Sequence, residues 1–489
     1  MTTSWIEAPP PGDRRSFWLE EALAADRGAP CPPLERRIGA DVCVLGGGFA
    51  GMWAAYELTE REPGLRIVLL EQDICGGGAS GRNGGFFSSS WHEFPELCGL
   101  FGLEEGRRYA TALAEEVDEV GRWLDRHGID AWFHAEGVMA VRTGSWQEGD
   151  PDQGPAAFAV RNGRPDAIRP LTLPQARAIA DSPRITSATF TPANAICQPA
   201  RLARGLRRVL LERGVAIFEG TRAISLEEGT PTIVRAERGA VRADHVVLTI
   251  GAWAAAWPGY RTAFGNIADY MVVTEPIPDR IRDDLGWTSW TGLADGRDLL
   301  YYLRRTDDGR LAIGGGSTGV VWGGSIGRRA THDRRVAQQA ARGLVWLFPQ
   351  LEGVRCTHAW GGPIDMTPTF VPFFHTRASG NVHAGLGFSG HGLAQTKLGG
   401  RILASLVLGS QDRWSTMPVV GAPIGTAPPE PLRWPLVRLA VWGMESGDRA
   451  DERGRGRGPV ARALQVAPLA YREALIARRR RGRDRVSRP

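Results

Sequence analysis

Residues 41–85 read DVCVLGGGFAGMWAAYELTEREPGLRIVLLEQDICGGGASGRNGG and decide the fold. The apolar run from Asp41 to Leu45 predicts a buried strand. Phe49 to Arg61 predict a helix, and Leu65 to Leu70 predict a second buried strand. A strand, a helix and a strand at this spacing form a βαβ unit, so we expect an α/β fold with a parallel sheet.

The loop between the first strand and the helix has the G-x-G-x-x-G pattern, with glycines at 46, 48 and 51. The first glycine allows a tight turn, the second lets the backbone approach a pyrophosphate, and the third lets helix and strand pack closely. The helix N-terminus then faces the phosphates. Glu71 follows the second strand, about 20 residues beyond Gly51, where an acid hydrogen-bonds a ribose hydroxyl. Because a carboxylate disfavours a 2′-phosphate there, the segment predicts an adenine dinucleotide other than NADP.

A second glycine-rich loop, Gly76 to Gly85, directly follows the second strand. An NAD dehydrogenase has no need of this loop, whereas FAD carries a second ring system that the chain must pass closely. The segment ASGRNGG, together with ADVCVLGGGFAG before it, resembles the D-amino-acid oxidase-like superfamily of FAD enzymes. Within that superfamily the chain is most similar to γ-glutamylputrescine oxidase-type amine oxidoreductases. The resemblance implies FAD as the cofactor.

Three later segments fit the same resemblance, namely VVLTIGAW at 246–253, LLYYLRRTDDGRLAIGGG at 299–316 and NVHAGLGFSGHG at 381–392. The last segment is followed by a predicted helix whose positive end would stabilise a reduced flavin. Ser80, Arg82 and Asn83 either contact the cofactor or only shape their loop, and we favour contact. The predicted cofactor-binding residues are Gly46, Gly48, Phe49, Ala50, Gly51, Glu71, Gln72, Ser80, Gly81, Arg82, Asn83, Gly84, Gly85, Gly251, Ala252, Trp253, Gly387, Ser389, Gly390, His391, Gly392 and Leu393.

The resemblance also implies the domain organisation. We expect a Rossmann-like FAD-binding domain of the glutathione-reductase type, with an inserted mixed-sheet α+β substrate domain. The FAD-binding domain is predicted to be discontinuous and to comprise residues 39–110, 195–262 and 355–410. The substrate domain is predicted at residues 111–194 and 263–354. The remaining residues predict an N-terminal extension (1–38, with a short helix at 16–25) and a C-terminal extension (411–489, with a charged linker at 445–458, a final helix and a basic tail).

Three residues are candidates for catalysis or substrate binding. His391 either polarises the flavin or packs in the core, and we favour the functional role. Tyr302 and Arg304 lie two residues apart on a predicted strand, so both face the same side of the sheet. Arg304 either binds an acidic substrate group or is a surface arginine. For His92 we favour a structural role over contact with the substrate.

Two departures from sarcosine-oxidase-like relatives bear on the chemistry. Those relatives have a lysine after the SGHG-Phe motif that holds a substrate carboxylate. Here Leu393 and Ala394 follow SGHG, and the only lysine of the chain is Lys397. The relatives also tether the flavin to a cysteine, whereas residues 360–368 contain none, so we expect non-covalent FAD. We expect no metal site. Cys356 lies just outside this stretch.

The expected reaction is oxidation of the C–N bond of an amine or amino acid by hydride transfer to flavin N5. The imine product hydrolyses to an aldehyde or keto acid. We expect an oxidase that reduces O2 to H2O2. The alternatives are a dehydrogenase that passes electrons to a quinone or protein acceptor, and a flavin-binding sensor without enzymatic activity.

The charge and composition of the chain limit the partners and the location that we expect. The 489 residues carry a net charge of +5, and much of the arginine excess lies in the last residues, so the body of the chain is near neutral. We therefore expect no nucleic-acid partner, and at most a peripheral membrane contact through the C-terminal extension. No apolar run reaches the roughly 18 residues that a membrane span needs. The six cysteines form no CxxC pair, which favours reduced thiols in a cytoplasmic protein.

Overall fold

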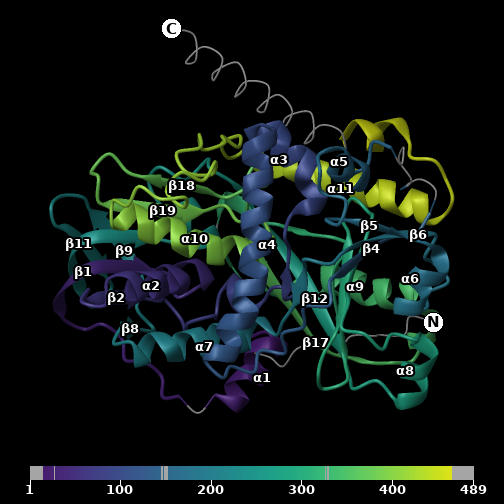
Figure 1. Cartoon of the computed structure of the whole chain (residues 1–489), viewed down its shortest axis with the longest axis horizontal. Helices are drawn as coiled ribbons and strands as arrows, with labels where there is room; N and C mark the ends of the chain where they lie inside the picture. The colour runs from purple at the N-terminus through teal and green to yellow at the C-terminus, as the bar shows by residue number, and fades with distance from the viewer. Residues whose placement is uncertain are drawn as a thin grey trace, which may run out of the picture.

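The computed structural model describes residues 15–26, 28–144, 147, 152–324, 326–327 and 330–464. Two large sheets lie side by side, with the eight-stranded sheet on the left in Figure 1 and the nine-stranded sheet on the right. The long helix α4 (Leu103–Arg126) runs between them in this view. All six cysteines lie within the described residues, and none forms a disulfide bond.

The eight-stranded sheet contains the βαβ unit that the sequence predicts. β1 (Arg37–Leu45), α2 (Phe49–Arg61) and β2 (Ile67–Leu70) follow one another, and β1 pairs in parallel with β2 and with β11. The strands read as continuous apolar runs because helices cover one face of the sheet and loops cover the other. The remaining elements of this half are β8 (Ala216–Phe218), β9 (Ala223–Glu227), β10 (Thr232–Ala236), β11 (Ala240–Leu248), β18 (Phe373–Thr376), β19 (Val382–Leu386), α7 (Pro199–Glu212) and α10 (Gly392–Val407).

The nine-stranded sheet is mixed and carries a separate hydrophobic core. Its central strands pair antiparallel, while β13 and β4 pair in parallel. The amphipathic helix α9 (Arg334–Leu347) covers one face with its buried apolar side. The strands are β4 (Val138–Arg142), β5 (Arg169–Leu171), β6 (Ser187–Thr191), β12 (Gly265–Thr274), β13 (Gly292–Asp295), β14 (Tyr301–Arg305), β15 (Leu311–Gly315), β16 (Gly319–Val320) and β17 (Cys356–Met366).

β17 differs from the predicted domain boundary at residue 355. The sequence assigns this strand to the FAD-binding domain, but it pairs along its length with β12 of the nine-stranded sheet. The reason is that β17 is long enough to pair with β12 and also to reach the eight-stranded sheet. It fills the edge of one sheet and ends at Met366, next to the loop that leads into β18 of the other sheet.

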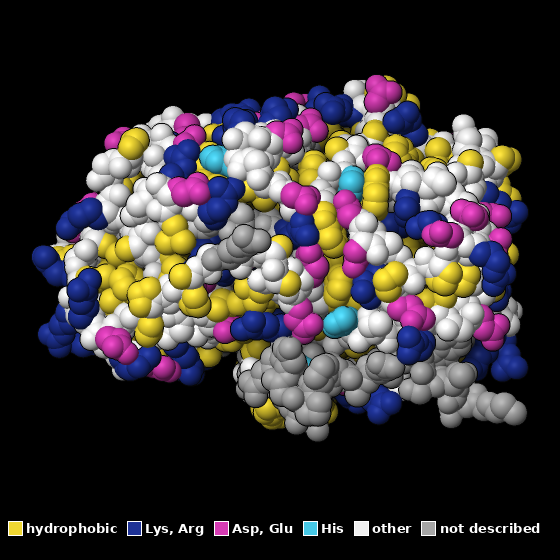
Figure 2. Space-filling model, turned by 90° about the horizontal axis from the view of Figure 1, so that it is seen from below, with side chains coloured by type: hydrophobic (Ala, Val, Ile, Leu, Met, Phe, Trp, Pro, Cys, Tyr) yellow, Lys and Arg dark blue, Asp and Glu magenta, His cyan; other side chains and the backbone are white. Residues whose placement is uncertain are grey.

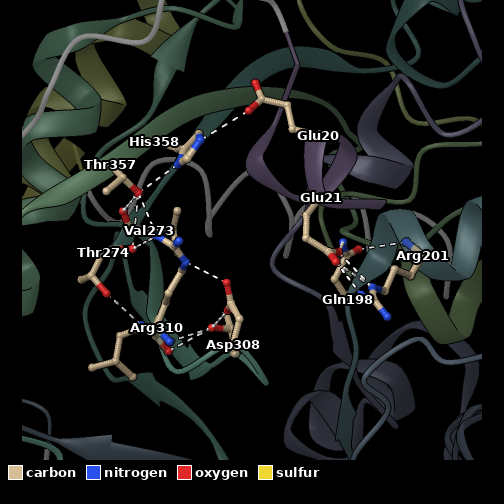
Figure 3. Close-up of polar contacts among 12 residues, drawn as sticks. Glu20, Glu21, Gln198, Arg201, Val273, Thr274, Asp308, Arg310, Thr357 and His358 are labelled. Carbon is tan, nitrogen blue, oxygen red and sulfur yellow. Dashed lines mark hydrogen bonds and ion pairs between the residues drawn. The ribbon is translucent and has the colours of Figure 1, made fainter. Parts of the chain in front are cut away.

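The helix α1 (Phe17–Ala25) connects the two halves of the molecule (Figure 3). Glu20 on one side of α1 forms an ion pair with His358 of β17 at 3.3 Å. Glu21 binds Arg201 at the start of α7 at 2.5 Å and accepts a hydrogen bond from Gln198. The predicted N-terminal extension is therefore a packed part of the fold, at least from residue 15 onward.

The predicted charged linker at residues 445–458 is wrong in its first half. This stretch continues the helix α11 (Arg433–Glu452), and its acids are buried against the nine-stranded sheet. Asp448 accepts hydrogen bonds from the backbone N–H groups of Asp298 and Leu299, and Arg457 forms an ion pair with Asp451. The predicted basic tail lies outside the described residues.

Two observations concern the surface. On the face in Figure 2, basic and acidic side chains are interspersed, so this face presents no continuous basic surface. In the described part of the chain, no helix combines the length and the apolar character needed to span a bilayer.

Candidate functional site

The turn between β1 and α2 has a backbone shape that needs glycine. Gly46 has a φ of +105°, and a Cβ there would lie 2.6 Å from the carbonyl oxygen of Thr249. A Cβ on Gly51 would lie 2.7 Å from the Thr249 hydroxyl oxygen, because α2 packs closely against β1 and β11. The first turn of α2 has no acidic side chain, so the positive end of its dipole is not compensated there. This turn fits a pyrophosphate.

Glu71 follows β2 and lies in the wall of a large cavity. Its two carboxylate oxygens accept hydrogen bonds from the backbone N–H groups of Gly47 (2.8 Å) and Asp73 (2.9 Å). Burial raises the pKa of Glu71 to about 7. A ribose hydroxyl that donates to this carboxylate would favour the ionised form, which fits the predicted role.

The second glycine-rich loop is built largely by its own side chains. Ser80 accepts a hydrogen bond from the N–H of Phe49 at 2.8 Å, so this loop caps α2. Asn83 donates to the carbonyl of Ser80 and accepts from the N–H of Gly85. Arg82 donates to the carbonyl oxygens of Gly77 and Gly361. The three polar residues therefore shape the loop, and they also line the cavity.

The C-terminal motif is held by Asp365 at the end of β17. Its carboxylate accepts the N–H of Gly387 at 2.6 Å and the N–H groups of Phe388 and Ser389. Burial raises the pKa of Asp365 to about 6. The loop ends at His391, which is the N-cap of α10, so the positive end of that helix points into the same cavity.

These four segments line one continuous cavity of about 1360 Å³. Nearly all of the predicted cofactor-binding residues lie in its wall, and Trp253 lies next to Gly78 of the second glycine-rich loop. The cavity runs from the β2 end, beside Glu71 and Thr221, to the start of α10. A glycine turn, a buried acid and two helix N-termini along one cavity fit FAD. The predicted residues that do not line it are Gly51, Gly81, Gly85 and Gly387, which instead permit close packing around it.

The part of the cavity beyond the second glycine-rich loop is walled by the nine-stranded sheet. Tyr302 of β14 lies over Gly84 and makes an edge-to-face contact with Phe86, with 5.6 Å between ring centroids. The Tyr302 hydroxyl donates to a carboxylate oxygen of Asp269 on β12 at 2.5 Å. Burial raises the pKa of Asp269 to about 6, although the hydrogen bond from Tyr302 opposes this.

Two histidines meet in the cavity near the start of α10. The ring centroids of His92 and His391 lie 6.2 Å apart, and Glu93 approaches Nδ1 of His391 to 3.7 Å. The three side chains each offer one atom within 4.8 Å of the others, which is also compatible with metal ligation. The His92 ring is open to the cavity and enclosed by protein elsewhere, and this burial lowers its pKa. Glu93 partly offsets that effect.

Two other candidate residues lie outside the cavity wall. Arg304 shares the face of Tyr302, since both approach the second glycine-rich loop, but its buried guanidinium donates to the carbonyl of Cys197 and stacks over Trp18. Burial lowers the pKa of Arg304 to about 10. Lys397 is also buried, in an ion pair with Glu57 at 2.6 Å. No cysteine of the described chain, Cys356 included, lines the cavity.

Sequence reasoning missed Asp269 and Asp365. Each lies in a strand that reads as apolar, GNIADYMVVT for Asp269 and CTHAWGGPIDM for Asp365. An acidic side chain inside such a strand is costly to bury, so its presence in an otherwise apolar run is the feature of the sequence that could have indicated a functional residue.

The comparisons with known proteins agree with this geometry. A family model described as FAD dependent oxidoreductase (DAO) matches residues 41–406. The chain is 28% identical to Gamma-glutamylputrescine oxidoreductase of Escherichia coli (strain K12), over 80% of this chain and 89% of that protein. Two solved structures share its fold: L-proline dehydrogenase from P. horikoshii (TM-score 0.63, 19% identity, 79% of this chain and 96% of that one) and glycine oxidase from Geobacillus kaustophilus (TM-score 0.60, 21% identity, 79% and 100%). The chain therefore belongs to the D-amino-acid oxidase-like family of FAD-dependent oxidoreductases.

Proposed function

We propose that the chain oxidises the C–N bond of an amine or amino acid and passes the electrons to O2. The observation that carries this proposal is the continuous cavity, which joins the predicted FAD site to a pocket walled by the nine-stranded sheet. Bound FAD would supply the two-electron acceptor for a hydride from the carbon next to the nitrogen. Relatives named for γ-glutamylputrescine, glycine and L-proline support this reaction class.

The histidine pair can accept a proton from the substrate ammonium group. An ammonium group has no free lone pair, so it must lose a proton before the neighbouring carbon gives up a hydride. Because burial lowers the pKa of His92, its ring is neutral at pH 7 and can accept this proton. Glu93 lies beside the histidine pair, where its carboxylate can stabilise the positive charge that forms.

The position of the pocket also suits hydride transfer. The Tyr302 and Phe86 rings form an aromatic wall beside Gly84, close to the loop that would pass the flavin. Aromatic walls exclude water and hold the carbon chain of a substrate in place. The start of α10 lies in the same cavity, where its dipole favours negative charge on the cofactor.

A dehydrogenase is the second candidate. It is favoured by the first half of α11, which exposes an apolar face that a quinone-containing membrane or a partner protein can cover. Arg438 is an exposed charge on that half, and the apolar side chains are Leu432, Leu436, Leu439 and Trp442. No lysine in the described chain lines the cavity, so oxygen activation would rely on an arginine of its wall, such as Arg82, or on the histidines.

Flavin bleaching tests both candidates. The holoenzyme is mixed anaerobically with a panel of amines and amino acids, and flavin absorbance is followed. We expect at least one class to bleach the flavin within seconds. Air is then admitted, and H2O2 formation at the rate of flavin reoxidation supports the oxidase. Reoxidation only by a quinone would support the dehydrogenase, and bleaching by no compound would refute C–N oxidation.

A further inference from the structure

Asp269 is a partly buried charge in the cavity wall that the reaction itself leaves unexplained. Its carboxylate accepts hydrogen bonds from the Tyr302 hydroxyl (2.5 Å), the N–H of Tyr270 (2.8 Å) and the N–H of Gly315. No arginine, lysine or histidine in the described part of the chain forms an ion pair with it. The neutral donors fix its position and leave its negative charge without a counterion.

The other acids of this wall differ in this respect. Asp295 pairs with Arg297 at 2.6 Å, and Asp298 pairs with Arg457 at 2.6 Å. Asp365 is wrapped by three backbone N–H groups of the C-terminal motif, which it holds in shape. Asp269 alone among these four combines a place in the cavity wall with no cationic partner and no loop to organise. Charges shielded from water in proteins are usually paired or held by several hydrogen bonds, so a cationic ligand group in the cavity would suit Asp269 as a partner.

The surroundings of Asp269 suit an alkylammonium group. The Tyr302 and Phe86 rings lie on one side, and aromatic faces attract cations. Ile267, two residues before Asp269 on β12, also lines the cavity and offers an apolar surface to an alkyl chain. An ammonium group here can still donate to this carboxylate, because each carboxylate oxygen can accept more than one hydrogen bond.

We propose that Asp269 binds a positively charged group at the far end of the substrate, so that the enzyme selects amines with a second cationic group, such as diamines and their derivatives. This inference rests on the proposed oxidation of a C–N bond. Asp269 is not assigned to the reacting nitrogen, because a carboxylate there would hold that nitrogen in its protonated, unreactive form. The reacting end instead lies toward His92 and His391, across the cavity.

The test compares 1,4-diaminobutane with n-butylamine in anaerobic flavin reduction by the holoenzyme. One charged hydrogen bond to a carboxylate that is shielded from bulk water changes affinity by roughly 10- to 100-fold. We expect half-saturation at a concentration lower by about that factor for the diamine. Asp269→Asn keeps the shape and removes the charge, so it should abolish this preference while the limiting rate changes less. Tyr302→Phe should reduce the preference in part.

Asp298→Asn is the matched control, since it removes a carboxylate of the same wall that already has its arginine. It should leave the ratio between the two amines unchanged. Flavin content and melting temperature of each variant show whether it is folded. An Asp269→Asn enzyme that is folded and still prefers the diamine overturns the inference. A wild-type enzyme whose flavin reduction is half-saturated at the same concentration of either amine also overturns it.

A binding measurement separates this inference from the proposed function. Butylguanidinium is charged and butylurea is its neutral isostere, and neither needs to be oxidised to bind. Difference spectra of the flavin, or melting curves, give their affinities for the wild type and for Asp269→Asn. Tighter binding of the cation that depends on Asp269 supports the inference even if no amine bleaches the flavin. Equal binding of the two compounds contradicts it.

Discussion

Replacing Lys397 with methionine tests whether the only lysine of the chain serves structure or catalysis. Lys397 lies on α10, and its ammonium group is 2.6 Å from Glu57 of α2 and 3.7 Å from Glu116 of α4. It also lies 4.8 Å from the centre of the Trp53 ring. The side chain is only 2% exposed, so these contacts are shielded from water. Lys397 therefore joins three helices and does not face the cavity.

The magnitude follows from the charges left behind. Methionine fills a similar volume, but it leaves the buried carboxylates of Glu57 and Glu116 with one positive charge fewer. Removing one partner of a buried ion pair costs about 3–5 kcal/mol. Arg401 remains 2.6 Å from Glu116 and 3.8 Å from Glu57, so we expect the lower end of this range, about 3 kcal/mol. Lys397→Arg keeps the charge and should cost less.

Urea unfolding followed by tryptophan fluorescence measures the effect. Lys397→Met should lower the unfolding midpoint, while flavin content and the rate of flavin reduction per folded molecule stay near the wild-type values. If Lys397→Met unfolds at the wild-type urea concentration, the buried ion pair does not stabilise the fold as we describe. If it binds flavin normally but is no longer reduced by substrate, the residue acts in catalysis and our placement is refuted.

Three further predictions follow from the cofactor site and from α1. Gly51→Ala should prevent FAD binding, because its Cβ would lie 2.1 Å from the carbonyl oxygen of Gly46 and distort the glycine turn, whereas Gly64→Ala, with open space around it, should not; the flavin-to-protein ratio decides. The pKa of Glu71 is about 7 in the fold and 4.5 when unperturbed, so its neutral form is favoured by folding. Without FAD, Glu71 should therefore lower the free energy of unfolding by up to about 3 kcal/mol as the pH rises from 4.5 to 7, and Glu71→Gln should make melting curves across that range less pH-dependent by this amount. Glu21→Ala should cost about 1 kcal/mol of stability by removing one of the two carboxylates that pair with Arg201, and should speed proteolysis near α1 in a timed digest.

The sequence predicted the FAD-binding half well because its signals are local. The helix predicted from Phe49 to Arg61 has the same ends in the structure, since the glycines before it and the turn after it fix both termini. The segment 246–253, which fits the resemblance, forms the end of β11 (Ala240–Leu248) and the turn after it, and the turn residues 249–253 line the cavity. Backbone shape near a dinucleotide depends on glycine positions, which are visible in the chain itself.

The features that were missed depend on partners far away in the sequence. The first half of the predicted linker is helical because Glu445 and Asp448 are bound by distant groups, namely the Ser317 hydroxyl and the backbone N–H groups of Asp298 and Leu299. Charge and glycine content suggested an exposed linker, and local sequence cannot show that these acids find buried partners. The same holds for the candidate site.

Arg304 and Asp269 show how the site departs from expectation. The alternation of the strand correctly put Tyr302 and Arg304 on one face, but it did not reveal where along β14 the cavity ends. Tyr302 reaches the cavity, while Arg304 lies beyond it under Cys197. The place of Asp269 in the site could not be predicted from the sequence, because it depends on the pairing of strands in the sheet that brings Asp269 of β12 beside the Tyr302 hydroxyl of β14.

The contacts of α1 also set an order for folding. This helix is among the first described segments to leave the ribosome. Its partners come later in the chain: the second glycine-rich loop at Gly81, α7 at Arg201 and β17 at His358. Contacts between such distant segments form slowly, because a long loop must close first. The apolar side of α1, with Phe17, Trp18 and Leu19, therefore stays exposed until nearly the whole FAD-binding region has been synthesised. During that interval it is a site for chaperone binding or aggregation, and its docking marks the completion of the native structure.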